Sequence, residues 1–155
     1  GEAESHRTGG MLWSVFATAC DVSEERYLKL IVARLATYLQ IPRYGEALVN
    51  VNGWDMDTLK SFRSAPIVAG MTGAIGSVAS YAELAEIEKL IPQEWRPAAV
   101  GDAKTCAQRW LDQFNAGADG IIIHASTPEE FAPVLDEYER IRPAELFAQR
   151  TNRPG

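Results

Sequence analysis

Cysteine and histidine are scarce in this sequence. Its 155 residues include two cysteines and two histidines, and neither Cys20 nor Cys106 has a second cysteine at CxxC spacing or a histidine close by. Isolated thiols of this kind are typical of a reducing compartment, so we expect two buried thiols, with a disulfide between them as the alternative. Since no His, Cys or carboxylate residues cluster at ligand spacing, the sequence predicts no metal site.

Clustered positive charge and long apolar runs are also missing. Lysine and arginine number 15 against 21 aspartates and glutamates, which gives a formal net charge of −6. With no basic cluster to offset this balance, binding to nucleic acid or to an anionic membrane surface is not expected. No apolar run approaches the about 20 residues of a transmembrane helix, and no charged-then-apolar leader opens the sequence, so we expect a cytoplasmic protein.

Three apolar runs have the length and composition of strands. They cover residues 11–20, 97–100 and 120–124, and the last of them, Gly-Ile-Ile-Ile-His, is continuously apolar, as in strands that are buried on both faces. Residues 65–69 are either a further short strand or a buried loop. The spacing of apolar residues predicts helices over 24–40, 56–63, 80–90, 103–116 and 128–141. Strands alternating with helices indicate an α/β protein with a parallel sheet covered by helices.

Residues that cap helices support these boundaries. Asp55 and Asp102 each stand directly before an expected helix, where a carboxylate accepts a hydrogen bond from a backbone amide of the first turn. Ser80 and Thr127 are each followed three residues later by a glutamate, which is the pattern of a capping box. Gly117 is expected to end the helix before it in a left-handed conformation.

An ordered series of short motifs fills the C-terminal third. Val100-Gly101-Asp102-Ala103 precedes Cys106-Ala107, then Phe-Asn-Ala-Gly-Ala-Asp-Gly-Ile-Ile-Ile-His at 114–124, then Thr127-Pro128-Glu129, Ala132-Pro133-Val134 and Tyr138. Ala-Thr-Ala-Cys-Asp at 17–21 and Ile-Pro-Gln-Glu-Trp at 91–95 come before them. In this order and spacing, from about Met11 to Pro143, the chain resembles the luciferase-like monooxygenase family and in particular its deazaflavin-dependent branch.

The resemblance implies a fold and a chemistry. The three strands would be the last of a (β/α)8 barrel, so that the chain would be a partial barrel of three β/α units. Residues 42–80 would be an insertion near the barrel mouth, 1–10 a tail or the end of a preceding helix, and 144–155 a tail. The activity implied is hydride transfer or oxygen insertion at FMN or coenzyme F420, a deazaflavin, with a small-molecule substrate.

The first five strands of the family barrel have no counterpart in this sequence. The family takes its acid/base residues from its first five strands, so no catalytic residue is assigned here, and we expect the chain alone to be inactive and to bind no coenzyme tightly. The sequence opens with Gly1-Glu2-Ala3-Glu4 and no initiator Met, which fits a fragment, a processed product or a tag remnant.

Coenzyme contacts are expected where the strands end, because barrel enzymes place their chemistry at the carboxyl ends of their strands. Gly101 would let the coenzyme approach the backbone, or would only relieve a tight turn. His124 would present a titratable imidazole at the barrel mouth, or would be a hydrogen-bonded residue packed beneath the last loop. Asp102 would touch substrate, or would be a plain helix cap.

A substrate pocket is expected from residues of two regions. Thr18 and Cys20 stand at the end of the first strand, and Tyr44 and Trp54 fall in the expected insertion. The alternatives are a buried thiol at Cys20 and an ordinary satellite core around the two aromatic residues.

Two other functions stay open. The spacing Gly70-x-x-Gly73-x-x-Gly76 would suit a phosphate-binding loop in a small nucleotide-binding domain. A catalytically silent assembly module is the other, completed by a second copy or by a complementing chain. Strands 11–19 and 120–124 would then be outer strands that associate through Trp13, Val15, Ile121 or Ile123.

Overall fold

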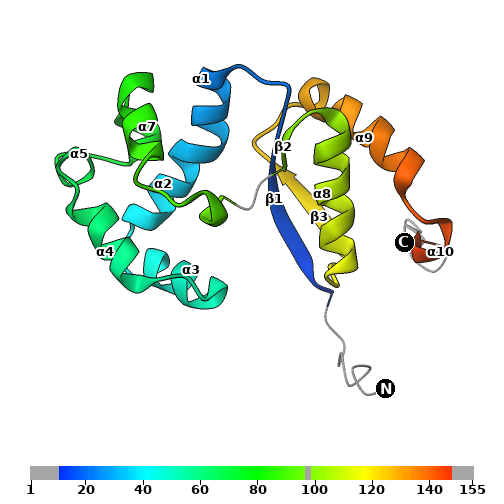
Figure 1. Cartoon of the computed structure of the whole chain (residues 1–155), viewed down its shortest axis with the longest axis horizontal. Helices are drawn as coiled ribbons and strands as arrows, with labels where there is room; N and C mark the ends of the chain where they lie inside the picture. Colours follow the sequence, from blue (N-terminus) through cyan, green and yellow to red (C-terminus); the bar gives the residue numbers. More distant parts are fainter. Residues whose placement is uncertain (1–10, 97–98, 148–155) are drawn as a thin grey trace. The chain divides into compact units, whose positions relative to one another are not determined.

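The computed structural model describes residues 11–96 and 99–147, and it divides the chain into two compact units (Figure 1). One unit, here called the sheet unit, takes the chain up to Cys20 and again from Ala99 onward. The other, here called the helical unit, comprises Asp21–Ala98. Among the described residues, none of the helices combines the length and apolar character needed to cross a bilayer.

The sheet unit contains a parallel sheet of three strands in the order β2-β1-β3. The strands are β1 (Trp13–Cys20), β2 (Ala99–Gly101) and β3 (Gly120–His124), all close to the ranges expected from the sequence. Thr18 pairs with Ala99 on one side of β1, and Val15 pairs with Ile122 on the other. The prediction of an α/β protein with a parallel sheet is confirmed.

The strand order differs from the one that consecutive barrel strands would have. Three neighbouring strands of a barrel pair in chain order, which would place β2 in the middle. Here β1 is in the middle, because the connection from β2 to β3 passes over it. The expectation that strand 11–19 is an outer strand is therefore wrong, whereas β3 is indeed an outer strand of the described sheet.

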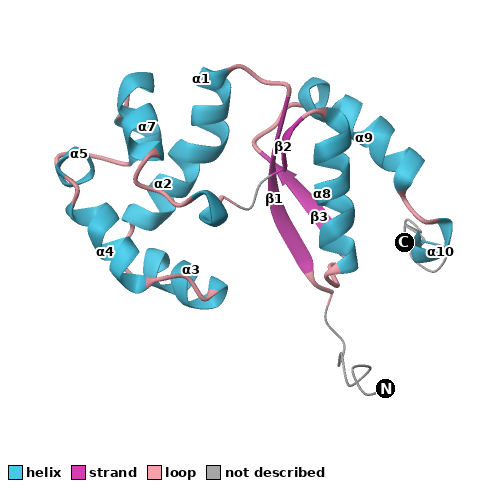
Figure 2. Ribbon diagram, in the orientation of Figure 1, coloured by secondary structure: helices cyan, strands magenta, loops and turns pink. Residues whose placement is uncertain are grey.

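Helices α8 (Ala103–Asn115) and α9 (Pro128–Ile141) pack against each other, and both contact β1 (Figure 2). Their apolar stripes meet the sheet in a core that centres on Trp110, whose ring lies edge-on to Phe131 and close to Tyr138. A further turn, α10 (Ala144–Phe147), follows α9. The expected caps are present, since Asp102 accepts from the Thr105 amide and Thr127 forms a capping box with Glu130.

One face of β3 is uncovered, contrary to the expectation from its three isoleucines. Ile121 and Ile123 pack against the core beneath α8 and α9, whereas Ile122 is 46% exposed. Alternate side chains of a strand point to opposite faces, and both helices cover the same face. The prediction that this strand is buried on both sides is wrong for that reason.

The helical unit begins with one continuous helical stretch from Glu24 to Gln40, as the sequence predicts. It consists of α1 (Glu24–Tyr27), a π-helical turn η1 (Leu28–Val32) and α2 (Ala33–Gln40). Next come α3 (Tyr44–Asn52), α4 (Met56–Ser64), α5 (Pro66–Ala69), α6 (Ile75–Val78), α7 (Tyr81–Glu88) and the 3-10 turn η2 (Gln93–Trp95). The expected insertion at 42–80 lies inside this unit.

Local signals explain most of these helices. Asp55 caps α4 by accepting from the Thr58 amide, and Ser80 with Glu83 forms the capping box of α7. Residues 66–69 form neither a strand nor a loop, because Pro66 at the first helical position begins the turn α5. Helix α3 was not expected. The helices share one apolar core, whose largest fully buried members are Phe62, Leu39, Leu59, Ile75, Leu84 and Ile87.

Candidate functional site

Unusual backbone conformations mark the carboxyl ends of the three strands. Gly101 ends β2 with φ of 125°, Ala125 follows β3 with φ of 67°, and Asp21 follows β1 with φ of 48°. For residues with a side chain, positive φ costs about 1–3 kcal/mol and persists only where the surroundings impose it. Such positions are frequent at ligand sites, and the carboxyl ends of parallel strands are where α/β proteins bind ligands.

Hydrogen bonds hold the loop after β3 against the end of β1. The Ser126 hydroxyl donates a short hydrogen bond to the Thr18 carbonyl. The Thr18 side chain is bound as well, because its hydroxyl accepts a hydrogen bond from the Trp110 indole N–H at 3.0 Å. Thr18 is 1% exposed, so the structure places it in the core beneath α8.

The two cysteines belong to the same core. Cys20 and Cys106 are buried and form no disulfide, which confirms the prediction of buried thiols. The Cys106 sulfur lies 3.9 Å from the Ala19 carbonyl oxygen and 3.8 Å from the Gly101 carbonyl oxygen, so it underlies the ends of β1 and β2. Cys20 therefore lies in the apolar interior of the sheet unit, where a thiol is an ordinary packing group.

Gly101 and Asp102 form the turn from β2 into α8. A β-carbon on Gly101 would meet Thr105 at 3.5 Å, an ordinary contact, so within the protein it is the positive φ and not the lack of space that favours glycine here. Asp102 accepts from the Thr105 amide at 2.8 Å, and this hydrogen bond lowers the pKa of the carboxyl group. The alternative that Asp102 is a helix cap is confirmed.

His124 is the last residue of β3 and is partly buried. It pairs in register with Ala17, so both side chains belong to the sheet face that α8 and α9 do not cover. The strained Ala125 comes directly after it. Of the expected coenzyme contacts, Gly101 and His124 thus both stand at the carboxyl end of a strand.

The expected pocket residues are divided between the two units. Tyr44, in the helical unit, is half-exposed, and its ring centroid lies 5.1 Å from that of Tyr38. Trp54 stacks on Trp95 with 4.8 Å between ring centroids and an interplanar angle of 7°. Trp54 therefore packs on the core of its own unit, which is the alternative that the sequence left open for it.

The glycine loop offers little to a phosphate. The Ile75 amide donates to the Gln40 side-chain oxygen at 3.1 Å, and the Gly76 amide donates to the Thr37 hydroxyl at 2.8 Å. The Gln40 side chain also donates to the Gly73 carbonyl at 3.0 Å. A phosphate-binding loop needs amides that point at the ligand, and both of these amides are committed to α2.

The helix starts at the strand ends also disfavour a phosphate. The first amides of α8 are capped by Asp102, and those of α9 by the reciprocal pair Thr127 and Glu130, with Glu129 beside them. An anion would meet carboxylates at both starts and would have to displace existing hydrogen bonds. FMN and coenzyme F420 both carry phosphate, so the described helix starts do not fit this part of either coenzyme.

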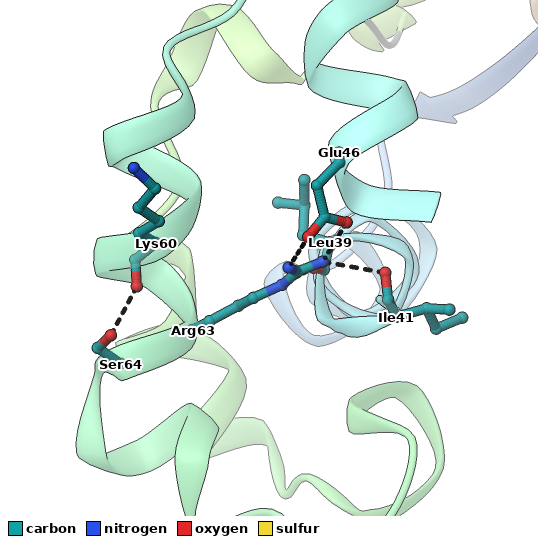
Figure 3. A network of polar contacts seen from close by, with 6 residues as sticks. All are labelled: Leu39, Ile41, Glu46, Lys60, Arg63 and Ser64. Atoms are coloured by element: carbon teal, nitrogen blue, oxygen red, sulfur yellow. Dashed lines mark hydrogen bonds and ion pairs between the residues drawn. The ribbon is translucent and has the colours of Figure 1, made fainter. Parts of the chain in front are cut away.

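The most extensive side-chain polar network in the helical unit holds helices together (Figure 3). The Arg63 guanidinium on α4 binds both carboxylate oxygens of Glu46 on α3, and it donates to the Leu39 carbonyl at 2.9 Å and the Ile41 carbonyl at 3.0 Å. The hydrogen bonds from Arg63 hold the pKa of Glu46 at about 2. Arg63 thereby satisfies the carbonyls at the end of α2, which is a structural role.

A second network closes the helical unit around Arg96. Its guanidinium donates to Glu88 at 2.5 Å, to the Tyr27 hydroxyl at 2.9 Å and to the Ile91 carbonyl at 3.0 Å. Burial raises the pKa of Tyr27 above its ordinary value, although Arg96 opposes this shift. This network joins α1 and α7 to the residue that follows η2, so we assign it to stability.

Within residues 11–96 and 99–147, no three His, Cys, Asp or Glu side chains are grouped as metal ligands. Comparison of the chain with protein-family models, with curated proteins and with solved structures finds no match. The strand ends of the sheet unit are therefore chosen as candidate site on geometry alone. The sequence places Ala125 and Ser126 at the end of the third strand but predicts no role for them, since neither residue type signals positive φ or a bridging hydroxyl.

Proposed function

We propose that the sheet unit binds a small molecule at the carboxyl ends of β1 and β3, and that the chain is part of an oxidoreductase. The observation that carries this proposal is the strained backbone of Ala125, which lies between His124 and the bridging Ser126. Strained non-glycine residues are frequent at ligand sites, and Ala125, unlike Arg43, stands at the carboxyl end of a strand between an imidazole and a bridging hydroxyl.

The resemblance in the C-terminal third makes flavins the first ligands to test. The reaction would be hydride transfer or oxygen insertion at FMN or coenzyme F420, and a small organic substrate would be the partner. The residues that this chain contributes are the Gly101 backbone and the His124 imidazole. Because both helix starts carry carboxylates, the phosphate of the coenzyme is held elsewhere, and tight binding and activity need a complementing chain or a second copy.

A partial (β/α)8 barrel is the finer version of the fold that goes with this proposal. The succession β2-α8-β3-α9, with parallel strands, supports it. The order β2-β1-β3 speaks against a direct continuation into a barrel, because β1 already has a neighbour on each side. An open parallel sheet that binds its ligand at the strand ends satisfies both observations.

The test is a titration of the isotopically labelled chain with FMN and with coenzyme F420, followed by the amide spectrum. We expect weak binding, above about 10 μM, with shifts concentrated at Gly101 and His124–Ser126. Ala125→Gly should raise stability by about 1 kcal/mol and weaken binding, because it releases the imposed conformation. Arg43→Gly, at the positive-φ residue before α3, is the matched control and should raise stability without an effect on binding. Shifts elsewhere, or none at millimolar ligand, would sink the proposal.

A catalytically silent assembly module is the second candidate. It is favoured by the exposed apolar side chains of the sheet, namely Trp13, Val15 and Ile122. A module of this kind would associate with another chain, but addition of FMN or coenzyme F420 would not shift the amide signals of the strand ends. The same titration therefore separates the two candidates.

A further inference from the structure

One face of the sheet carries large apolar side chains that neither α8 nor α9 covers. Residues paired in register in a parallel sheet point to the same side, so Trp13 with Gly120, Val15 with Ile122, and Ala19 with Val100 share this face. Its exposed members are Trp13 at 53%, Val15 at 63%, Ile122 at 46% and Val100 at 39%. These four residues are called the open face below.

The opposite face is fully occupied, which fixes the sidedness of the sheet. Ser14 there donates to Gln113 of α8 at 2.9 Å, and Thr18 accepts from Trp110 of the same helix. Ile121 and Ile123 pack against the core beneath the helices. Of the four residues expected to mediate association, Ile121 and Ile123 are thus partly buried in the core of their own chain, whereas Ile122 shares the open face with Trp13 and Val15.

The open face carries no charge. A β-carbon at Gly120 would lie 2.2 Å from the Trp13 ring, so the indole lies directly over this glycine. The strand positions on this side are alanine, valine, isoleucine, glycine, tryptophan and histidine, with no Asp, Glu, Lys or Arg among them. When a surface meets its own copy across a twofold axis, each charge faces a like charge near the axis, and this surface has none.

The exposed area matches the requirement of a small dimer. Met11 and Leu12, the two residues before β1, are also exposed, at 68% and 53%. Together with the open face they present about 600 Å² of apolar surface, so that two copies would bury about 1,200 Å², the lower limit for a specific protein–protein interface. An area of this size is at the upper end of the apolar patches found on single chains, and such patches often mark interaction sites.

We propose that the open face binds the open face of a second copy of this chain. Two sheets then pack face to face at the usual spacing of about 10 Å, with α8 and α9 of each copy on the outside. The His124 side chain belongs to the same sheet face, so the dimer interface lies next to the proposed ligand site. Because each chain has a net charge of −6, repulsion between the copies weakens the dimer at low salt, and added salt strengthens it.

The test measures the sedimentation of the full chain at protein concentrations from about 1 to about 200 μM. Quenching of tryptophan fluorescence by acrylamide is measured over the same range. We expect a monomer–dimer equilibrium in the micromolar range. Trp13 is 53% exposed, Trp54 in the helical unit is partly buried, and Trp95 and Trp110 are each 3% exposed. Acrylamide quenching should therefore fall as the dimer forms and covers Trp13. Trp13→Phe should remove most of this dependence on concentration.

The variant Val15→Thr with Ile122→Thr keeps side chains that favour strands while it adds hydroxyls to the open face. We expect it to raise the dissociation constant at least about tenfold. Val51→Thr is the matched control, because Val51 is 86% exposed on α3 in the helical unit, and it should leave the constant unchanged.

Several outcomes would overturn the proposal. A wild-type chain that stays monomeric at all concentrations, with Trp13 equally open to acrylamide, shows that a second copy does not occupy the face. A dimer that the double variant leaves intact, while circular dichroism shows the variant to be folded, uses another surface. If the double variant fails to fold, the concentration dependence of Trp13 quenching in the wild type decides the question, and its absence refutes the dimer.

Discussion

The hydrogen bond between Trp110 and Thr18 yields the sharpest test of the core of the sheet unit. The indole N–H donates at 3.0 Å to a hydroxyl that is almost wholly buried, and Trp110 itself is 3% exposed. Thr18→Val keeps the shape of the side chain but leaves the indole N–H without its acceptor, which should cost about 1–3 kcal/mol. Thr18→Ser keeps the hydroxyl and loses one methyl group, which should cost about 1 kcal/mol.

A double-mutant cycle separates these two causes. In a Trp110→Phe background no N–H remains to be stranded, so Thr18→Val should cost less than about 0.5 kcal/mol. Thr18→Ser should still cost about 1 kcal/mol there, because the loss of its methyl group does not depend on the indole. The coupling between Thr18→Val and Trp110→Phe is then about 1–2 kcal/mol, whereas that for the serine variant is close to zero.

Amide hydrogen exchange in α8 and β1 is the suitable assay, because the chain contains two compact units that need not unfold together. An equal cost of Thr18→Val in both backgrounds would refute the proposed role of the hydrogen bond. If instead both Thr18 variants left stability unchanged and altered ligand binding, Thr18 would line a pocket, as the sequence suggested, and its placement in the core would be wrong.

Two further predictions concern the helical unit. The pKa of Glu46 lies at about 2, below its ordinary 4.5, because Arg63 stabilises the carboxylate. The contribution of this ion pair to the free energy of unfolding is therefore complete above pH 4.5 and is lost as the pH falls towards 2. The destabilisation caused by Glu46→Gln, measured by urea unfolding across pH, should shrink over this window, and a difference independent of pH would contradict the pairing. A β-carbon at Gly45 would lie 2.6 Å from the Leu39 carbonyl oxygen and 2.6 Å from the Arg63 guanidinium, so Gly45→Ala should cost about 1–3 kcal/mol. Gly73→Ala, which meets only a half-exposed valine side chain, should stay within about 1 kcal/mol, and thermal melts in the reverse order would show that the packing is misplaced.

Features set by neighbours in the sequence were the ones that the sequence predicted well. The caps Asp55, Asp102 and Ser80, and the stretch from Glu24 to Gln40, depend on contacts within one or two turns, and the structure has all of them. The fold class follows from the alternation of such elements. The unexpected helix α3 begins after Arg43, whose positive φ has no signature in the sequence.

Features set by distant contacts were not predictable. The continuous apolar run of β3 suits a strand covered on both faces, but whether a second layer exists depends on helices elsewhere in the chain. The central position of β1 depends on which of two later strands reaches each of its edges, which no local pattern records. At the candidate site, the positions of Gly101 and His124 at the strand ends were predicted, whereas the strain at Ala125 depends on the tie between Ser126 and Thr18.

The central place of β1 also determines the order in which this protein can be completed during synthesis. β1 leaves the ribosome first, but its first partner, Ala99–Gly101, follows only after the whole helical unit, and its second, Gly120–His124, follows later still. The helical unit can form its own core while β1 waits as an unpaired apolar strand. Closing so long a loop is entropically costly unless the intervening residues are already compact, so the helical unit should fold first. Slow translation of that unit would therefore prolong the time for which the backbone of β1 is unpaired and Ala19 and Cys20 are exposed, and chaperones that bind apolar strands would be needed most at this stage.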